Sequence, residues 1–233
     1  MLNYIAEKLN DWVKNDRKNI EKMSVSDLLL AYRENPAVSR PYVYDNIKNC
    51  LPFHVCLHEA GHYMMALKYK MSVNSVTLMR VVLNDASSVR GSVVRLDNEE
   101  FETETKPYVS FALGGCMGEI SSFITENDFK ETGNAIFNPV SSVGDAKRAI
   151  SKQFKLNDRD KQTRLNEFDH GEDRARSEIL TLVRNFCLDD LDYMFKNIDG
   201  HDLYAKKMYD AWRSNNFQKT KLDKNLEIDN RIA

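Results

Sequence analysis

Residues 52–70 read PFHVCLHEAGHYMMALKYK, and this stretch decides both the fold and the site that we expect. Proline suits the first turn of a helix, where its missing N–H would have no partner. Pro52 can therefore begin a helix that runs through the histidine-rich segment to about residue 70. On such a helix His58 and His62 lie four residues apart on one face, so both imidazoles can reach a single metal ion.

Residues 58–62 read HEAGH, an HExxH pattern that places an acid beside the two histidines. Glu59 follows His58 about 100° around the helix, so its carboxylate lies at the edge of the same site. Zinc lowers the pKa of a bound water towards neutrality, and a nearby carboxylate can then accept its proton as the water attacks a carbonyl. The spacing predicts two metal ligands, His58 and His62, and a general base, Glu59.

A catalytic zinc site needs a third protein ligand and leaves one position open. His54 lies on the same stripe of the helix, but it is two turns, about 12 Å, from His62, so one ion cannot comfortably bind all three histidines. We expect His54 to be a core residue or an outer partner of the site. Spacing alone does not choose among the other candidates, which are Glu119, Glu126, Asp145, His170 and His201.

Beyond residue 70 the hydrophobic period changes and later returns to that of a helix. Residues 75–83 and 91–96 are rich in Val, Thr and Leu and predict two strands of a small sheet. Ser141 or Ser142 could cap one of the later helices. The fold class that follows is mainly α with a small β-sheet, an α+β fold. The predicted later helices cover residues 107–126, 145–154, 172–195 and 203–212.

The remaining segments divide the chain into three parts. Residues 1–50 begin with an amphipathic helical pattern, and we expect a helical segment that packs on the core. Residues 51–215 form the expected main domain, with loops at residues 97–104 and 127–141. Residues 216–233 are polar and are predicted to be a disordered tail.

The composition excludes several classes of protein. The formal net charge of −2 gives no basic face of the kind that binds nucleic acid or an acidic membrane. The 4 cysteines contain no Cys-x-x-Cys pair and are too few for a disulfide scaffold. The first residues do not read as a signal peptide, and no apolar run is long enough to span a bilayer. We therefore expect a cytoplasmic protein without nucleic-acid or membrane partners.

Four further blocks follow the HEAGH motif in a fixed order. Together with the motif they resemble the peptidase domain of the FtsH-type family, the M41 metallopeptidases, over roughly residues 50–210. The block at 113–119 is similar to the family's LGGRxAE helix, and the block at 141–149 is similar to the segment that supplies the family's third metal ligand. These four blocks are 75–80 (SVTLMR), 91–94 (GSVV), 113–119 (LGGCMGE) and 141–149 (SSVGDAKRA). Residues 169–182 also resemble the start of the family's C-terminal helical pair.

This resemblance implies a zincin-like M41 core, Zn²⁺ as the cofactor and Asp145 as the third ligand. Glu119 has two interpretations, as an outer carboxylate that orients a ligating histidine or as an alternative ligand, and we favour the first. Gly114 and Gly115 are interpreted as packing glycines. The expected activity is that of a zinc metalloendopeptidase acting on protein or peptide substrates.

The chain departs from the family in lacking its ATPase module. It contains no GxxxxGK[ST] loop to hold a phosphate, so we expect ATP-independent cleavage of unfolded or flexible segments. The sequence does not determine the oligomeric state, which the ATPase module normally organises in the family. An alternative is a proteolytically silent domain that binds a protein partner through the peptidase groove. The strand over 75–83 is either a plain core strand or an edge that pairs with an extended substrate.

Overall fold

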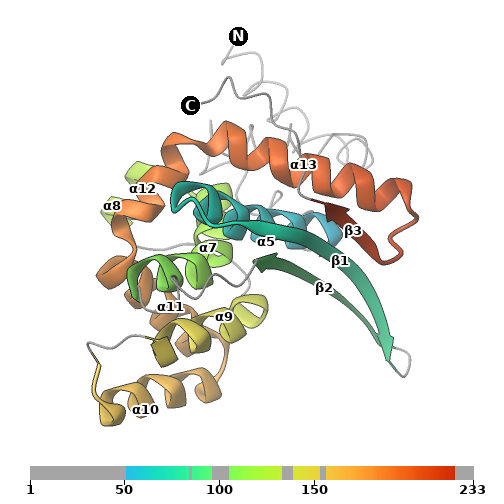
Figure 1. The fold of residues 1–233 in the computed structure, drawn as a ribbon. Helices are drawn as coiled ribbons and strands as arrows, with labels where there is room; N and C mark the ends of the chain where they lie inside the picture. The colour runs from blue at the N-terminus through green and yellow to red at the C-terminus, as the bar shows by residue number, and fades with distance from the viewer. Residues whose placement is uncertain (1–50, 84–85, 96–104, 133–138, 153–155, 224–233) are drawn as a thin grey trace, which may run out of the picture.

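The computed structural model describes residues 51–83, 86–95, 105–132, 139–152 and 156–223 (Figure 1). The predicted N-terminal helical segment at 1–50 and the predicted loop at 97–104 lie outside the described residues. The described part is mainly helical with a small three-stranded antiparallel sheet, so the predicted α+β class is confirmed.

Two helices form the centre of the fold, α5 (Leu51–Lys68) and α7 (Thr105–Phe123). Their backbones approach very closely: a Cβ atom added at Gly61 would lie only 2.2 Å from the carbonyl oxygen of Gly114. Only glycine fits at such a crossing. The contact fixes α5, which carries the HEAGH motif, rigidly against α7.

The other helices surround this central pair. Figure 1 shows α13 running along α5, and α9 and α11 on the opposite side of the molecule. None of the helices in the described part of the chain combines the length and apolar character needed to cross a bilayer. The surrounding helices are α8 (Glu126–Thr132), α9 (Pro139–Lys152), α10 (Asp158–Glu167), the 3₁₀ turn η1 (Phe168–His170), α11 (Glu172–Phe186), α12 (Leu188–Lys196) and α13 (Ile198–Ser214).

The sheet has the order β2-β1-β3, with both pairings antiparallel. Its strands are β1 (Val73–Leu83), β2 (Ala86–Arg95) and β3 (Thr220–Asp223). Val76 and Leu78 of β1 are buried on the face that meets the helices. Residues 75–78 of β1 thus lie between β2 and β3, which corrects the hypothesis of a substrate-binding edge for this part of the strand. Residues 79–83 pair with β2 alone among the described strands. Among the described strands, β2 is the edge that packs on α5.

The prediction of a loop over residues 127–141 is wrong for two parts of this segment. α8 occupies its first part, because Phe129 is buried and gives a short helix an apolar anchor. α9 begins at Pro139, where proline is favoured in the first turn. Ser142 therefore lies inside α9 rather than capping it, and its hydroxyl donates to Glu119 instead.

Two further predictions near the C-terminus are corrected. The predicted helix over 172–195 is two helices that meet at Cys187, whose φ of −134° is not helical. The break places Asp190 in the first turn of α12, where Lys68, Lys106 and Ser110 bind its carboxylate. The predicted tail contains β3, because the chain turns after α13 and pairs with β1.

Candidate metal centre

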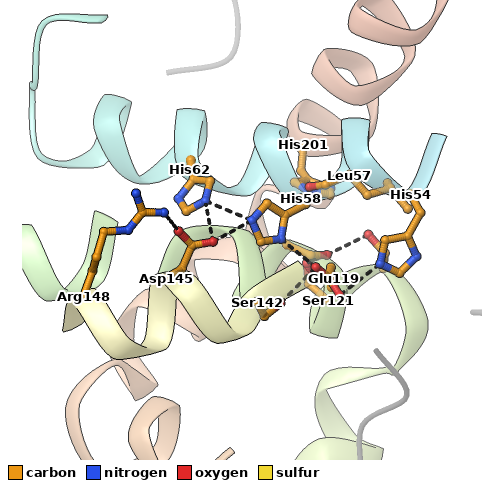
Figure 2. A network of polar contacts seen from close by, with 12 residues as sticks. His54, Leu57, His58, His62, Glu119, Ser121, Ser142, Asp145, Arg148 and His201 are labelled. Atoms are coloured by element: carbon orange, nitrogen blue, oxygen red, sulfur yellow. Dashed lines mark hydrogen bonds and ion pairs between the residues drawn. The ribbon is translucent and has the colours of Figure 1, made fainter. Parts of the chain in front are cut away.

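Three buried side chains from α5 and α9 converge on one point (Figure 2). The Nε2 atoms of His58 and His62 lie 3.1 Å apart. Oδ2 of Asp145 lies 2.8 Å from Nε2 of His58 and 3.4 Å from Nε2 of His62. The structure therefore brings together the three residues proposed as ligands, although 83 residues separate His62 from Asp145 in the sequence.

The spacing of these donors fits a metal ion. Ligands held tetrahedrally at about 2.0–2.1 Å from zinc lie about 3.3 Å from one another. The three observed separations of 2.8, 3.1 and 3.4 Å are close to this value. The group formed by His58, His62 and Asp145 could hold a metal ion.

Both imidazoles are oriented for this role by contacts at their other nitrogen. Nδ1 of His58 lies 2.6 Å from Oε1 of Glu119, and Nδ1 of His62 lies 2.7 Å from the carbonyl oxygen of Phe111. A carboxylate and a carbonyl can only accept, so each Nδ1 carries the hydrogen and donates it. With a metal ion bound, each Nε2 would present its lone pair at the shared point, as in metal-binding histidines. In the structure as it stands, Nε2 of His58 is placed to donate to Oδ2 of Asp145; burial would lower the pKa of His58, but its hydrogen bonds to Asp145 and Glu119 raise it well above the usual range.

Glu119 is fully buried behind His58 in a network of its own. Its Oε1 accepts from Ser142, 3.1 Å away, and its Oε2 lies 3.0 Å from Nε2 of His54. Burial alone would raise the pKa of Glu119, but the charges and hydrogen bonds of His54 and His58 lower it to about 2. Because Glu119 contacts the Nδ1 side of His58, it cannot share an ion with Nε2 of the same ring, and this geometry fits the orienting role.

Glu59 lies beside the three donors with a free carboxylate oxygen. It is 4% exposed, and within the described residues its Oε2 has no hydrogen-bond partner. Burial raises the pKa of Glu59, while the nearby His62, His58 and Arg148 oppose that rise. A buried carboxylate with a raised pKa is a stronger base than an exposed one, which suits it to proton transfer.

Two glycines mark where the backbone touches the site. A Cβ atom at Gly91 in β2 would lie 2.5 Å from Cγ and Oε1 of Glu59. A Cβ atom at Gly115 in α7 would lie 2.3 Å from Nε2 of His58. Gly114 packs against the α5 backbone as predicted, whereas Gly115 gives room to a ligand side chain, which the sequence pattern did not indicate.

Arg148 was also missed by the sequence analysis. Its Nη2 forms an ion pair with Oδ1 of Asp145, and this leaves Oδ2 to face the histidines. Burial would raise the pKa of Asp145, but the charges and hydrogen bonds of His62 and His58 hold it well below its usual range. Arg148 lies three residues after Asp145 and therefore on the same helix face. This spacing points to Arg148 only after Asp145 has been identified as a candidate metal ligand.

The remaining candidate ligands lie elsewhere. Glu126 pairs with Lys130 on α8, and His170 is exposed in η1. His201 is buried in α13, where its Nε2 donates to the carbonyl oxygen of Leu57 at 2.9 Å. Within the described residues, the group around Asp145 is the one set of three or more such side chains that could hold a metal ion.

Comparisons with known proteins give no relative. No family model matches the chain, and no curated protein or solved structure is significantly similar to it. The functional interpretation therefore depends on the chemistry of the site itself.

Proposed function

We propose that this chain is a zinc-dependent, ATP-independent endopeptidase of the FtsH-like M41 type, acting on flexible or unfolded protein segments. One observation carries the proposal. Three ligand atoms, from His58, His62 and Asp145, converge beside Glu59, a buried carboxylate with an oxygen that has no partner among the described residues.

The donor set supports zinc as the metal. Two imidazole nitrogens and one carboxylate oxygen suit Zn²⁺, whereas Ca²⁺ and Mg²⁺ prefer sites built from oxygen alone. The same donors also occur in iron oxygenases. The adjacent Glu59 favours hydrolysis over oxygen chemistry, since a hydrolase needs a base at this position and an oxygenase does not.

In the proposed reaction the residues of the chain move one proton. His58, His62 and Asp145 would hold the zinc ion, which would supply Lewis acidity to a water molecule and to the carbonyl of the scissile peptide. Glu59 accepts the proton of the attacking water and then donates it to the leaving amine as the C–N bond breaks. The burial that raises the pKa of Glu59 makes its carboxylate a stronger base for this task.

The sheet edge offers a binding mode for the peptide. β2 is paired only with β1 among the described strands, and its Gly91 lies directly against Glu59. An extended peptide that pairs with β2 would use backbone hydrogen bonds, which tolerate many side chains. This arrangement supports unfolded or flexible segments as the substrate class.

The test is hydrolysis of reduced, carboxymethylated α-lactalbumin, with the zinc content of each protein measured by mass spectrometry. We expect the wild type to cleave it, and Glu59→Gln to keep zinc while losing about 10²–10⁴-fold in rate. Glu126→Gln is the matched control, because Glu126 lies on α8 away from the site and should leave the rate unchanged. Equal rates for Glu59→Gln and the wild type would refute the proposal.

A further inference from the structure

The polar network of the site has one buried end and one exposed end. It runs from His54 through Glu119 and the candidate ligands to Arg148 (Figure 2). His54 is 6% exposed and Asp145 is 4% exposed, whereas the side chain of Arg148 is 66% exposed. Arg148 is therefore the member of this network that is most accessible to a molecule in solution.

The face of α9 that carries Asp145 also carries two positively charged side chains. Residues 145, 148 and 152 share one helix face, which places Lys152 on the same stripe as Arg148. Nζ of Lys152 lies 5.4 Å from the ring centre of Tyr108 on α7. Phe111, one turn further along α7, contacts the ring of His62 with 5.4 Å between ring centres. Arg148 and Phe111 thus contact the candidate ligands directly, and Lys152 and Tyr108 lie next to them on α9 and α7.

These cations have unused capacity for an anion. A guanidinium has five N–H donors, and Arg148 uses its Nη2 for Asp145. Lys152 makes no ion pair within the described residues, while Lys147 on the same helix is paired with Asp169. Arg148 itself lies against the candidate metal ligand Asp145.

From this arrangement we infer that Arg148, assisted by Lys152, binds a carboxylate of the substrate beside the metal centre. A planar guanidinium with free donors pairs with a carboxylate through parallel N–H···O bonds. The inference rests on the proposed peptidase function and adds a substrate class, peptides with a carboxylate next to the scissile bond. That carboxylate belongs to an Asp or Glu side chain or to a free C-terminus.

The test uses pairs of fluorescence-quenched peptides built around a cleavage site mapped in α-lactalbumin. One pair differs by Glu or Gln beside the scissile bond, and another by a C-terminal acid or amide. We expect kcat/KM to be about fivefold higher for the acid of one pair, the size of a partly exposed ion pair. The pair that shows the difference identifies the source of the carboxylate, and no difference in either pair would overturn the inference.

Variants of Arg148 distinguish recognition of the substrate carboxylate from a role in holding Asp145 in place. Arg148→Gln should bring the ratio of kcat/KM values within the pair close to one, and Arg148→Lys should retain part of it. Lys147→Gln on the same helix is the matched control and should keep the full ratio. If Arg148 only holds Asp145, Arg148→Gln will slow both peptides of the pair equally and leave their ratio unchanged, which also overturns the inference.

A binding measurement keeps this inference distinct from the proposed activity. Fluorescence anisotropy of labelled α-lactalbumin peptides that differ only by Glu or Gln, or by a C-terminal acid or amide, requires neither turnover nor a mapped cleavage site when zinc-loaded Glu59→Gln protein is used. A fivefold preference for the acid that disappears when Arg148→Gln is added supports the carboxylate site, even if the wild type hydrolyses nothing and the peptidase proposal fails. Hydrolysis without any preference in rate or binding leaves the peptidase standing and removes the carboxylate site.

Discussion

Replacing Gly115 with alanine places a methyl group against a candidate metal ligand. The added Cβ would lie 2.3 Å from Nε2 of His58, while ordinary contact begins near 3.4 Å, so the imidazole must retreat by about 1.1 Å. Metal–ligand distances tolerate changes of about 0.2 Å. We therefore expect Gly115→Ala to lose at least about 100-fold in zinc affinity, the upper range for disturbing an outer partner of a ligand.

The control for this change is Gly144→Ala. A Cβ atom at Gly144 meets no other atom within 4 Å, although this residue lies in α9 immediately before Asp145. Alanine is favoured over glycine inside a helix by about 1 kcal/mol, so this variant should be slightly more stable and bind zinc normally. Gly115→Ala gains the same helix propensity, but overpacking offsets it by about 1–3 kcal/mol.

Competition with a chromophoric chelator measures the zinc affinity of both variants, and urea unfolding measures their stability. Wild-type zinc affinity for a folded Gly115→Ala protein would refute the reasoning, because it would mean that His58 is not held where the geometry places it. A loss of affinity in Gly144→Ala of the same size would show that helix substitutions near the site act nonspecifically.

Three further predictions concern the buried charges and the metal. Asp190→Asn should lower the free energy of unfolding by about 2–3 kcal/mol at pH 7, because partners such as Lys68 and Lys106 lose a buried counterion. Burial would raise the pKa of Asp190, but the hydrogen bonds from its partners lower it. The stabilisation from ionised Asp190 is therefore present above the unfolded pKa and is lost as the pH falls towards the folded pKa. The free energies of unfolding measured in urea at pH 7 and pH 3 should differ less for the variant than for the wild type. Glu119→Gln should weaken zinc binding about 10–100-fold in chelator competition, and Ser142→Ala should weaken it less. Removal of metal with a chelator should lower the melting temperature and abolish hydrolysis, and added zinc should restore both.

The part of the site that the sequence predicts is the part that one helix determines. His58, Glu59 and His62 are placed by the period of α5, which is a local property. Asp145 is different, because its separation from the motif is bridged only by tertiary packing. Spacing left five candidates for the third ligand, and the resemblance to a known family, rather than geometry, selected Asp145.

The errors in the fold have the same cause. The apolar positions around Cys187 keep a helical period, since Val183 and Leu191 are each four residues away and all three are buried. Periodicity therefore indicates one continuous helix and cannot detect the break that brings Asp190 to its cationic partners. Residues 220–223 are mostly polar and become a strand only because β1 offers them unpaired backbone groups.

The charges around the site give an independent argument for a bound cation. Three buried carboxylates, from Glu59, Glu119 and Asp145, surround the two histidines. Burial would lower the pKa of His58, but its hydrogen bonds to Asp145 and Glu119 raise it, so the group favours an added positive charge. Burying uncompensated charge is expensive, and proteins neutralise it with protons or a metal. A metal ion between His58, His62 and Asp145 would supply that positive charge in place of a proton, using the Nε2 lone pairs of the two histidines. Arg148 would keep its ion pair with Asp145, and the other N–H groups of its exposed guanidinium would face a carboxylate of the substrate.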